Sequence, residues 1–190
     1  MPKAGDVSHA ADRPAPPNGG TCALDLDNAF WRFSLAVYAS DGVAQECLAL
    51  QDAFELDVNL LLFCAWMGSR TIVLTPSHLE AAGLAVEIWH AGVVRPLRGV
   101  RQQIKALARD EFEAFRSQVK SLELEAEQIE QAMLFAHAQT IAAATSNAKP
   151  REAIAENVRA YVEIARSRAG PTDLPSVSCL IAAALRQRPA

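Results

Sequence analysis

The segment from Asp57 to Gly68, DVNLLLFCAWMG, constrains the fold more than any other part of the chain. Its apolar residues would surround a helix on every side, and such a helix belongs in the middle of a bundle. The apolar run is too short for a membrane span, which needs about 20 residues. The segment therefore predicts a central core helix, with Asp57 as its N-cap and Gly68 at its C-terminal end.

Helical spacing of apolar residues continues through the rest of the chain, and strand signals are nearly absent. The clearest helix start is Thr75-Pro76, an N-cap threonine followed by proline at the first helical position. Pro96 is expected to introduce a kink or a new helix start. These patterns predict an all-α fold, a compact multi-helix bundle.

A heptad seam runs from Ala108 to Ala136, so we expect one long, coiled-coil-like helix in this region. Its apolar stripe needs a cover. Ile154, Val158 and Tyr161 form a matching stripe, so we expect the C-terminal helices to fold back over the long helix. The chain would then be a monomer. A dimer through the long helix is the alternative. The seam consists of Ala108, Phe112, Phe115, Val119, Leu122, Ala126, Ile129, Met133 and Ala136.

The chain is expected to divide into three parts. Residues 1–20 are rich in proline and contain no apolar core of a secretion signal, so we expect a disordered N-terminal tail. Residues 21–145 should form a helical domain, and residues 146–190 a C-terminal helical extension that packs on the first part. Hydrophobic residues make up 51% of the chain and charged residues 21%, which is typical of a folded domain.

Charge and cysteine content restrict the partners and the compartment. The net charge of −4 argues against general affinity for nucleic acids or anionic membranes. The four cysteines form no C-x-x-C pair, and we interpret them as reduced thiols. Without a signal or a span, we expect a cytoplasmic protein that does not associate with membranes.

Five basic residues recur at steps of three and four, so they lie on one side of a helix. Such a basic stripe would hold phosphate groups or an acidic partner surface. The alternative is a solvated helix face, neutralised by the chain's own acidic helix. The stripe consists of Arg95, Arg98, Arg101, Lys105 and Arg109.

Several polar residues stand beside the apolar helix, where they need hydrogen-bond partners or solvent. They either line a small pocket or cap helix ends. Aromatic residues on neighbouring helices, among them Trp31 and Trp89, would help to enclose a pocket. The candidate pocket residues are Gln51, Asp52, Asn59 and Trp66.

No metal, cofactor or catalytic motif is complete. Glu87 and His90 match the E-x-x-H spacing of di-iron bundles, but such a site requires a second copy and two further glutamates. No second copy exists, so we expect no metal ligands and no cofactor. The neighbours of Cys64 are apolar, which predicts a buried and unreactive thiol.

Four motifs follow one another in a set order: Trp-x-Phe, Gly-Val…Cys-Leu-x-Leu-Gln, Asp-Val-x-x-Leu-Leu and Arg-Pro-Leu-Arg. In this order they resemble a proteobacterial family of conserved hypothetical proteins, a domain of unknown function. The resemblance covers roughly residues 28–131. It implies a cytoplasmic, bacterial, helical protein and no established activity. The motif residues are Trp31, Phe33, Gly42, Val43, Cys47, Leu48, Leu50, Gln51, Asp57, Val58, Leu61, Leu62 and Arg95 to Arg98.

Two classes of function remain, and a structure distinguishes them. We favour a non-enzymatic protein-binding or adaptor module with an unknown protein partner, acting through the basic stripe. The alternative is a helical protein, including an enzyme, that binds a small molecule or cofactor in an aromatic-lined pocket. RNA or ribosome association through the stripe carries the least weight. An adaptor predicts a packed interior and an exposed patch of one charge, whereas a small-molecule binder predicts a cavity with converging polar groups.

Overall fold

The computed structural model describes residues 23–141, 148–169 and 175–187, so the tail expected at 1–20 lies outside the described residues. The described elements are all helical, which confirms the predicted all-α fold. Within these ranges, no helix combines the length and the hydropathy that a membrane crossing requires. The elements are α1 (Ala29–Tyr38), α2 (Val43–Phe54), α3 (Val58–Ser69), α4 (Pro76–Trp89), the π-helical segment η1 (His90–Val94), α5 (Arg95–Ala106), the short 3-10 helix η2 (Asp110–Phe112), α6 (Glu113–Ala138), α7 (Pro150–Ala169) and α8 (Ser178–Arg186).

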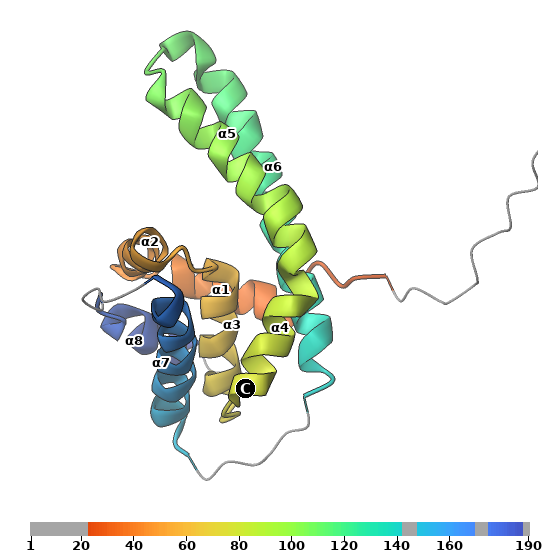
Figure 1. Cartoon of the computed structure of the whole chain (residues 1–190), viewed down its shortest axis with the longest axis vertical. Helices are drawn as coiled ribbons and strands as arrows, with labels where there is room; N and C mark the ends of the chain where they lie inside the picture. Colours follow the sequence, from red (N-terminus) through yellow and green to blue (C-terminus); the bar gives the residue numbers. More distant parts are fainter. Residues whose placement is uncertain (1–22, 142–147, 170–174, 188–190) are drawn as a thin grey trace, which may run out of the picture.

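Helix α3 is the centre of the bundle, as its apolar sequence predicts. All its residues from Asn59 to Ser69 are buried. α7 packs along it, and α1, α2, α6 and α8 also contact it (Figure 1). Asp57 is the N-cap, and its carboxylate accepts a hydrogen bond from the Asn59 backbone N–H at 2.8 Å. This bond satisfies one of the free N–H groups at the helix start.

Residues 76–106 form one continuous helical stretch of α4, η1 and α5. Thr75 caps it as predicted, and His78 completes a capping box. Pro96, where a kink or a new helix start was expected, lies in the first turn of α5, and proline is tolerated at that place. The π-helical segment lies directly before α5. Single-turn π segments occur frequently at functional sites.

Helix α5 and the first part of α6 form an antiparallel arm that projects from the bundle (Figure 1). The chain reverses between them, with Ala108 at a φ of 49° in the left-handed region. α6 is the long helix expected from the seam, but it begins at Glu113, so Ala108 and Phe112 of the seam precede it. Val119 and Ala126 of the seam are buried. Phe115 and Leu122 are 58% and 52% exposed. The seam is therefore only partly covered.

The expected cover of the seam by the C-terminal helices is wrong. Ile154 and Val158 are fully buried in the core, where α7 packs chiefly against α3 rather than along α6. The reason is that α3 is apolar on all sides and has more apolar surface to bury than α6. Packing α7 on α3 removes more of this surface from water.

Helix α8 is attached through Glu46 of α2. The Glu46 carboxylate accepts hydrogen bonds from the backbone N–H groups of Cys179 and Leu180, at 3.0 Å and 2.9 Å. Burial disfavours the charged form of Glu46, but these backbone bonds outweigh it and lower the pKa of this carboxyl group. A carboxylate at a helix start also interacts favourably with the helix dipole.

Substitution Glu46→Gln is expected to destabilise the protein by about 1 kcal/mol at neutral pH, a value typical of lost N-terminal caps. The folded pKa lies below the unfolded value, so the contribution is present above the unfolded pKa. It is lost as pH falls through the folded pKa. Urea unfolding of both proteins should show the difference at pH 7 and a smaller one near about pH 3. A difference that does not depend on pH would contradict this role of the carboxylate.

Candidate functional site

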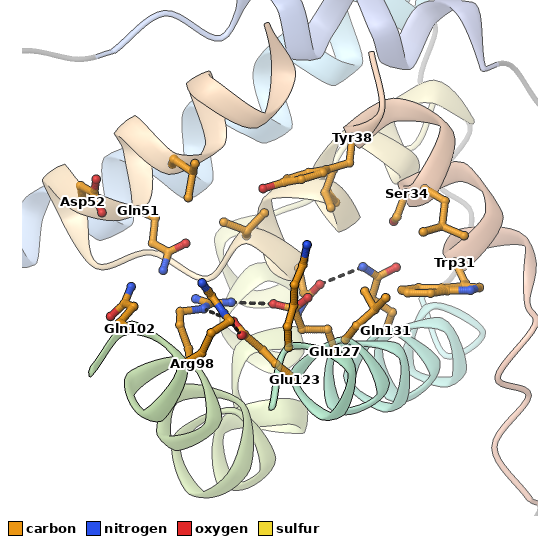
Figure 2. Close-up of a pocket in the computed structure, with 18 residues that line it drawn as sticks. Trp31, Ser34, Tyr38, Gln51, Asp52, Arg98, Gln102, Glu123, Glu127 and Gln131 are labelled. Atoms are coloured by element: carbon orange, nitrogen blue, oxygen red, sulfur yellow. Dashed lines mark hydrogen bonds and ion pairs between the residues drawn. The ribbon is translucent and has the colours of Figure 1, made fainter. Parts of the chain in front are cut away.

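A cavity of about 420 Å³ lies where the arm meets α1, α2 and α3. Figure 2 shows side chains of α1, α2, α5 and α6 facing one another across this space. Trp31, Tyr38 and several leucines form its apolar wall. Its polar wall consists of Ser34, Gln51, Asp52, Asn59, Arg98, Arg101, Gln102, Lys120, Glu123, Glu127 and Gln131.

Two arginines of α5 hold the arm together at the mouth of the cavity. Arg98 donates from Nε to Glu123 Oε1 at 3.1 Å and from Nη2 to Glu127 Oε1 at 2.7 Å. Arg101 donates to both oxygens of Glu123. Burial opposes ionisation of Glu123, but the bonds from both arginines lower its pKa. The network fixes α5 against α6 and shapes one wall of the cavity.

The five residues of the predicted basic stripe differ in how they are paired. Arg98 and Arg101 are engaged in the chain's own ion pairs, while Arg109 forms an exposed pair with Glu111 at 3.2 Å. Among the described residues, Arg95 and Lys105 form no ion pair; both are exposed. The stripe is therefore partly neutralised by the acidic helix α6.

Substitution Arg98→Ala is expected to lower the free energy of unfolding by about 2 kcal/mol, because Glu123 and Glu127 lose a partly buried charged partner. Arg109→Ala removes the same charge from an exposed pair and should change it by less than about 0.5 kcal/mol. Urea unfolding of the two variants makes the comparison. Equal effects would contradict a structural role for Arg98.

A chain of amide groups leaves one buried acceptor without a partner on a residue of the cavity wall. Asn59 Nδ2 donates to Glu130 Oε2 at 3.0 Å, so Asn59 Oδ1 faces Gln131. Gln131 must then present its amide nitrogen, which donates to Asn59 Oδ1 at 2.8 Å. The remaining oxygen, Gln131 Oε1, is buried without a hydrogen-bond partner among the described residues. Ser34 Oγ, also on the cavity wall, is in the same state.

The candidate pocket residues from the sequence lie in two places. Gln51, Asp52 and Asn59 line the cavity. Trp66 does not; it packs in the core, with its ring centroid 5.2 Å from that of Phe30. Gln131 was not predicted from the sequence, because an acidic and polar helix is typically solvated and no local pattern marks its buried positions.

A second polar cluster lies on the other side of Asn59. His90 Nδ1 is 3.0 Å from Glu130 Oε1 and 3.3 Å from Asp57 Oδ2. Burial and repulsion by the Glu130 carboxylate raise the pKa of Asp57 well above its ordinary value. Burial also raises the pKa of Glu130. Within the described residues, these three side chains are the group whose ligand atoms converge closely enough to hold a metal ion.

The E-x-x-H motif is not the basis of this cluster. Its glutamate, Glu87, is exposed and lies outside the group, whereas its histidine, His90, joins carboxylates that are distant in sequence. The chain brings them together because Asp57 caps α3, His90 opens η1, and Glu130 lies on the buried face of α6.

A family model with the description "Protein of unknown function (DUF2390)" matches residues 29–134 of the chain. The matched range begins with α1 and ends within α6, so it contains every residue of the cavity wall and of the polar cluster. No curated protein and no solved structure matches the chain.

Proposed function

The chain belongs to the DUF2390 family of proteins of unknown function, and from its cavity we propose that it binds a small molecule with N–H donor groups and an apolar or aromatic part. The observation that carries the proposal is the pair of unpartnered oxygens, Ser34 Oγ and Gln131 Oε1, on the wall of a cavity of about 420 Å³. Ligand sites are typically concave and largely apolar, with a few placed polar groups.

The chemistry of the wall indicates what the ligand offers. A buried acceptor without a partner costs about 1–3 kcal/mol, and a ligand N–H at Gln131 Oε1 removes that cost. Glu127, which accepts a hydrogen bond from Arg98, lies on the same wall and adds a second oxygen that can accept from a ligand. Trp31 and Tyr38 provide flat apolar surfaces. An amine or amide attached to a ring or short chain fits this wall.

The adaptor function stays as the second candidate because the arm exposes large apolar side chains. Leu107, Phe115 and Leu122 are 59%, 58% and 52% exposed, and Arg95 and Lys105 are exposed nearby. Exposed apolar groups on a projecting element are typical of protein-binding surfaces. The internal pairing of Arg98 and Arg101 weakens the case for RNA or phosphate binding by the stripe. Affinity capture with Phe115→Ser and Leu122→Ser variants tests this candidate.

A cytoplasmic location belongs to the same proposal. Cys47 and Cys64 are free and buried. Burial raises the pKa of the Cys47 thiol to about 12 and raises that of Cys64 as well, so both behave as inert apolar residues. Such thiols fit a reducing compartment.

The test is a thermal-shift screen of ring compounds that carry amine or amide groups, followed by calorimetric titration of the hits. Ser34→Ala removes one cavity oxygen that has no partner, so the fold should stay intact while affinity falls about tenfold. Ser40→Ala is the matched control, because Ser40 lies just beyond the C-terminal end of α1, bonded to Ala36 O and outside the cavity wall. If hits bind both variants equally, the cavity is not their site.

A further inference from the structure

A cluster of two carboxylates and one imidazole is buried between α3, η1 and α6, apart from the cavity wall. Glu130 is fully buried and Asp57 is 7% exposed. Asp57 is the N-cap of α3 and Glu130 belongs to α6, and both carboxylates accept hydrogen bonds from Asn59. Asp57 Oδ1 accepts from the Asn59 N–H, and Glu130 Oε2 accepts from Asn59 Nδ2. The remaining oxygens, Asp57 Oδ2 and Glu130 Oε1, face His90 Nδ1.

The cluster has more acceptors than donors. His90 Nδ1 carries at most one hydrogen, and Glu130 Oε1 is its nearest acceptor at 3.0 Å. Glu130 Oε2 and Asp57 Oδ2 both lie 3.3 Å from the same nitrogen. Asp57 Oδ2 consequently has no hydrogen-bond partner among the described residues, although it is buried. Paired buried carboxylates are costly unless a cation or a proton joins them.

The spacing of these atoms fits a metal ion. Bonds of about 2.1 Å to nitrogen and oxygen ligands place neighbouring ligand atoms of a tetrahedral site about 3.4 Å apart. The distances of 3.0 Å and 3.3 Å from Nδ1 are close to that value, and all three ligand atoms lie within 4.8 Å of one another. We propose that Asp57, His90 and Glu130 bind one divalent transition-metal ion of the zinc class.

The surroundings supply the other features of such a site. Asn59 holds Glu130, and Tyr161 holds the backbone of Asp57 through its hydroxyl, 3.0 Å from the Asp57 nitrogen. Partners of this kind orient metal ligands. A second cavity, of about 430 Å³, has Asp57 and His90 in its wall and would provide the entry path for the ion. One imidazole with two carboxylates favours Zn²⁺ or Mn²⁺ over Mg²⁺ and Ca²⁺, which prefer oxygen ligands alone.

The sequence alone predicted no metal ligands, because the E-x-x-H motif of Glu87 and His90 has no second copy in the chain. The proposed ligands come from three elements, so no local motif announces them. This cluster lies outside the wall of the small-molecule cavity, and the hydrogen-bonded pair Asn59 and Gln131 lies between the two.

The test is calorimetric titration of the tag-free, EDTA-treated full chain with ZnCl₂ and, separately, MnCl₂ and MgCl₂. We expect one saturable Zn²⁺ site per chain and a higher thermal midpoint with Zn²⁺ bound. Asp57→Asn and Glu130→Gln should each weaken Zn²⁺ binding by at least about tenfold. Both are close in shape to the native residues, and asparagine also caps helices, so circular dichroism should show native helix content.

Glu87→Gln is the matched control, because it removes the exposed carboxylate of the E-x-x-H motif and leaves the cluster intact. It should bind Zn²⁺ as the unmodified chain does. The proposal is overturned if the folded chain binds neither Zn²⁺ nor Mn²⁺, if both amide variants bind Zn²⁺ normally, or if Glu87→Gln loses as much affinity as they do.

Discussion

Substitution Trp66→Ala is expected to lower the free energy of unfolding by about 3 to 5 kcal/mol, the range for large aromatic residues removed from a core. Trp66 lies in the middle of α3 and is 3% exposed. Its ring packs against Phe30, Phe63 and Phe135, with centroid distances of 5.2, 6.2 and 5.8 Å. Alanine would leave a cavity among three aromatic rings that cannot all move inward. Urea unfolding monitored by circular dichroism measures the loss.

Ile88→Ala is the control for this prediction. Ile88 is 89% exposed on α4, so its removal should change stability by less than about 0.5 kcal/mol. A loss below about 1 kcal/mol for Trp66→Ala would mean that α3 is not the central helix and that its neighbours repack freely.

Substitution Gly68→Ala should cost about 3 kcal/mol, the upper end of the usual range for overpacking. A Cβ atom at this position would lie 2.5 Å from the Ile154 Cα and 2.8 Å from the Ala153 carbonyl carbon. These are backbone atoms of α7, so no side-chain rotation relieves the clash. Only a shift of α7 away from α3 accommodates the methyl group, and that shift opens the centre of the core.

Gly99→Ala provides the matched comparison. Gly99 lies in α5, and nothing lies within 4 Å of the place that an added Cβ atom would occupy, so alanine should stabilise the helix by up to about 1 kcal/mol. Opposite signs for the two glycine substitutions, measured by urea unfolding, support a close backbone approach of α3 and α7. A neutral or stabilising effect of Gly68→Ala would contradict this close approach, because the α7 backbone at Ile154 would then leave room for a methyl group at position 68.

The sequence was most informative where local physics decides the structure. The apolar run of α3 requires burial on all sides, and the structure places it at the centre. Asp57 and Thr75 both cap helices as predicted, because side-chain capping depends on a few neighbouring atoms. For the same reason, Gln51, Asp52 and Asn59 could be selected as polar residues beside an apolar helix, and they line the cavity.

The parts that the sequence did not predict depend on distant segments. Ala108 reverses the chain in a left-handed conformation that glycine or asparagine usually adopts, so the arm carries no turn signal. Glu130 stands in an acidic helix and is nevertheless fully buried, because α3 and η1 bring Asn59 and His90 to it. Asn157 was also missed. It is buried and bonds to Leu74, Cys64 and Ile72.

Native mass spectrometry after exposure to a cell metabolite extract tests most directly whether the chain binds a small molecule in the cavity between the arm and α1–α2. The full chain should carry one additional small molecule. Leu48→Trp, which enlarges a half-exposed side chain at the cavity wall without removing a hydrogen bond, should lose it and stay folded. A chain that captures no molecule, or a Leu48→Trp variant that carries the same molecule to the same extent, would contradict binding in this cavity.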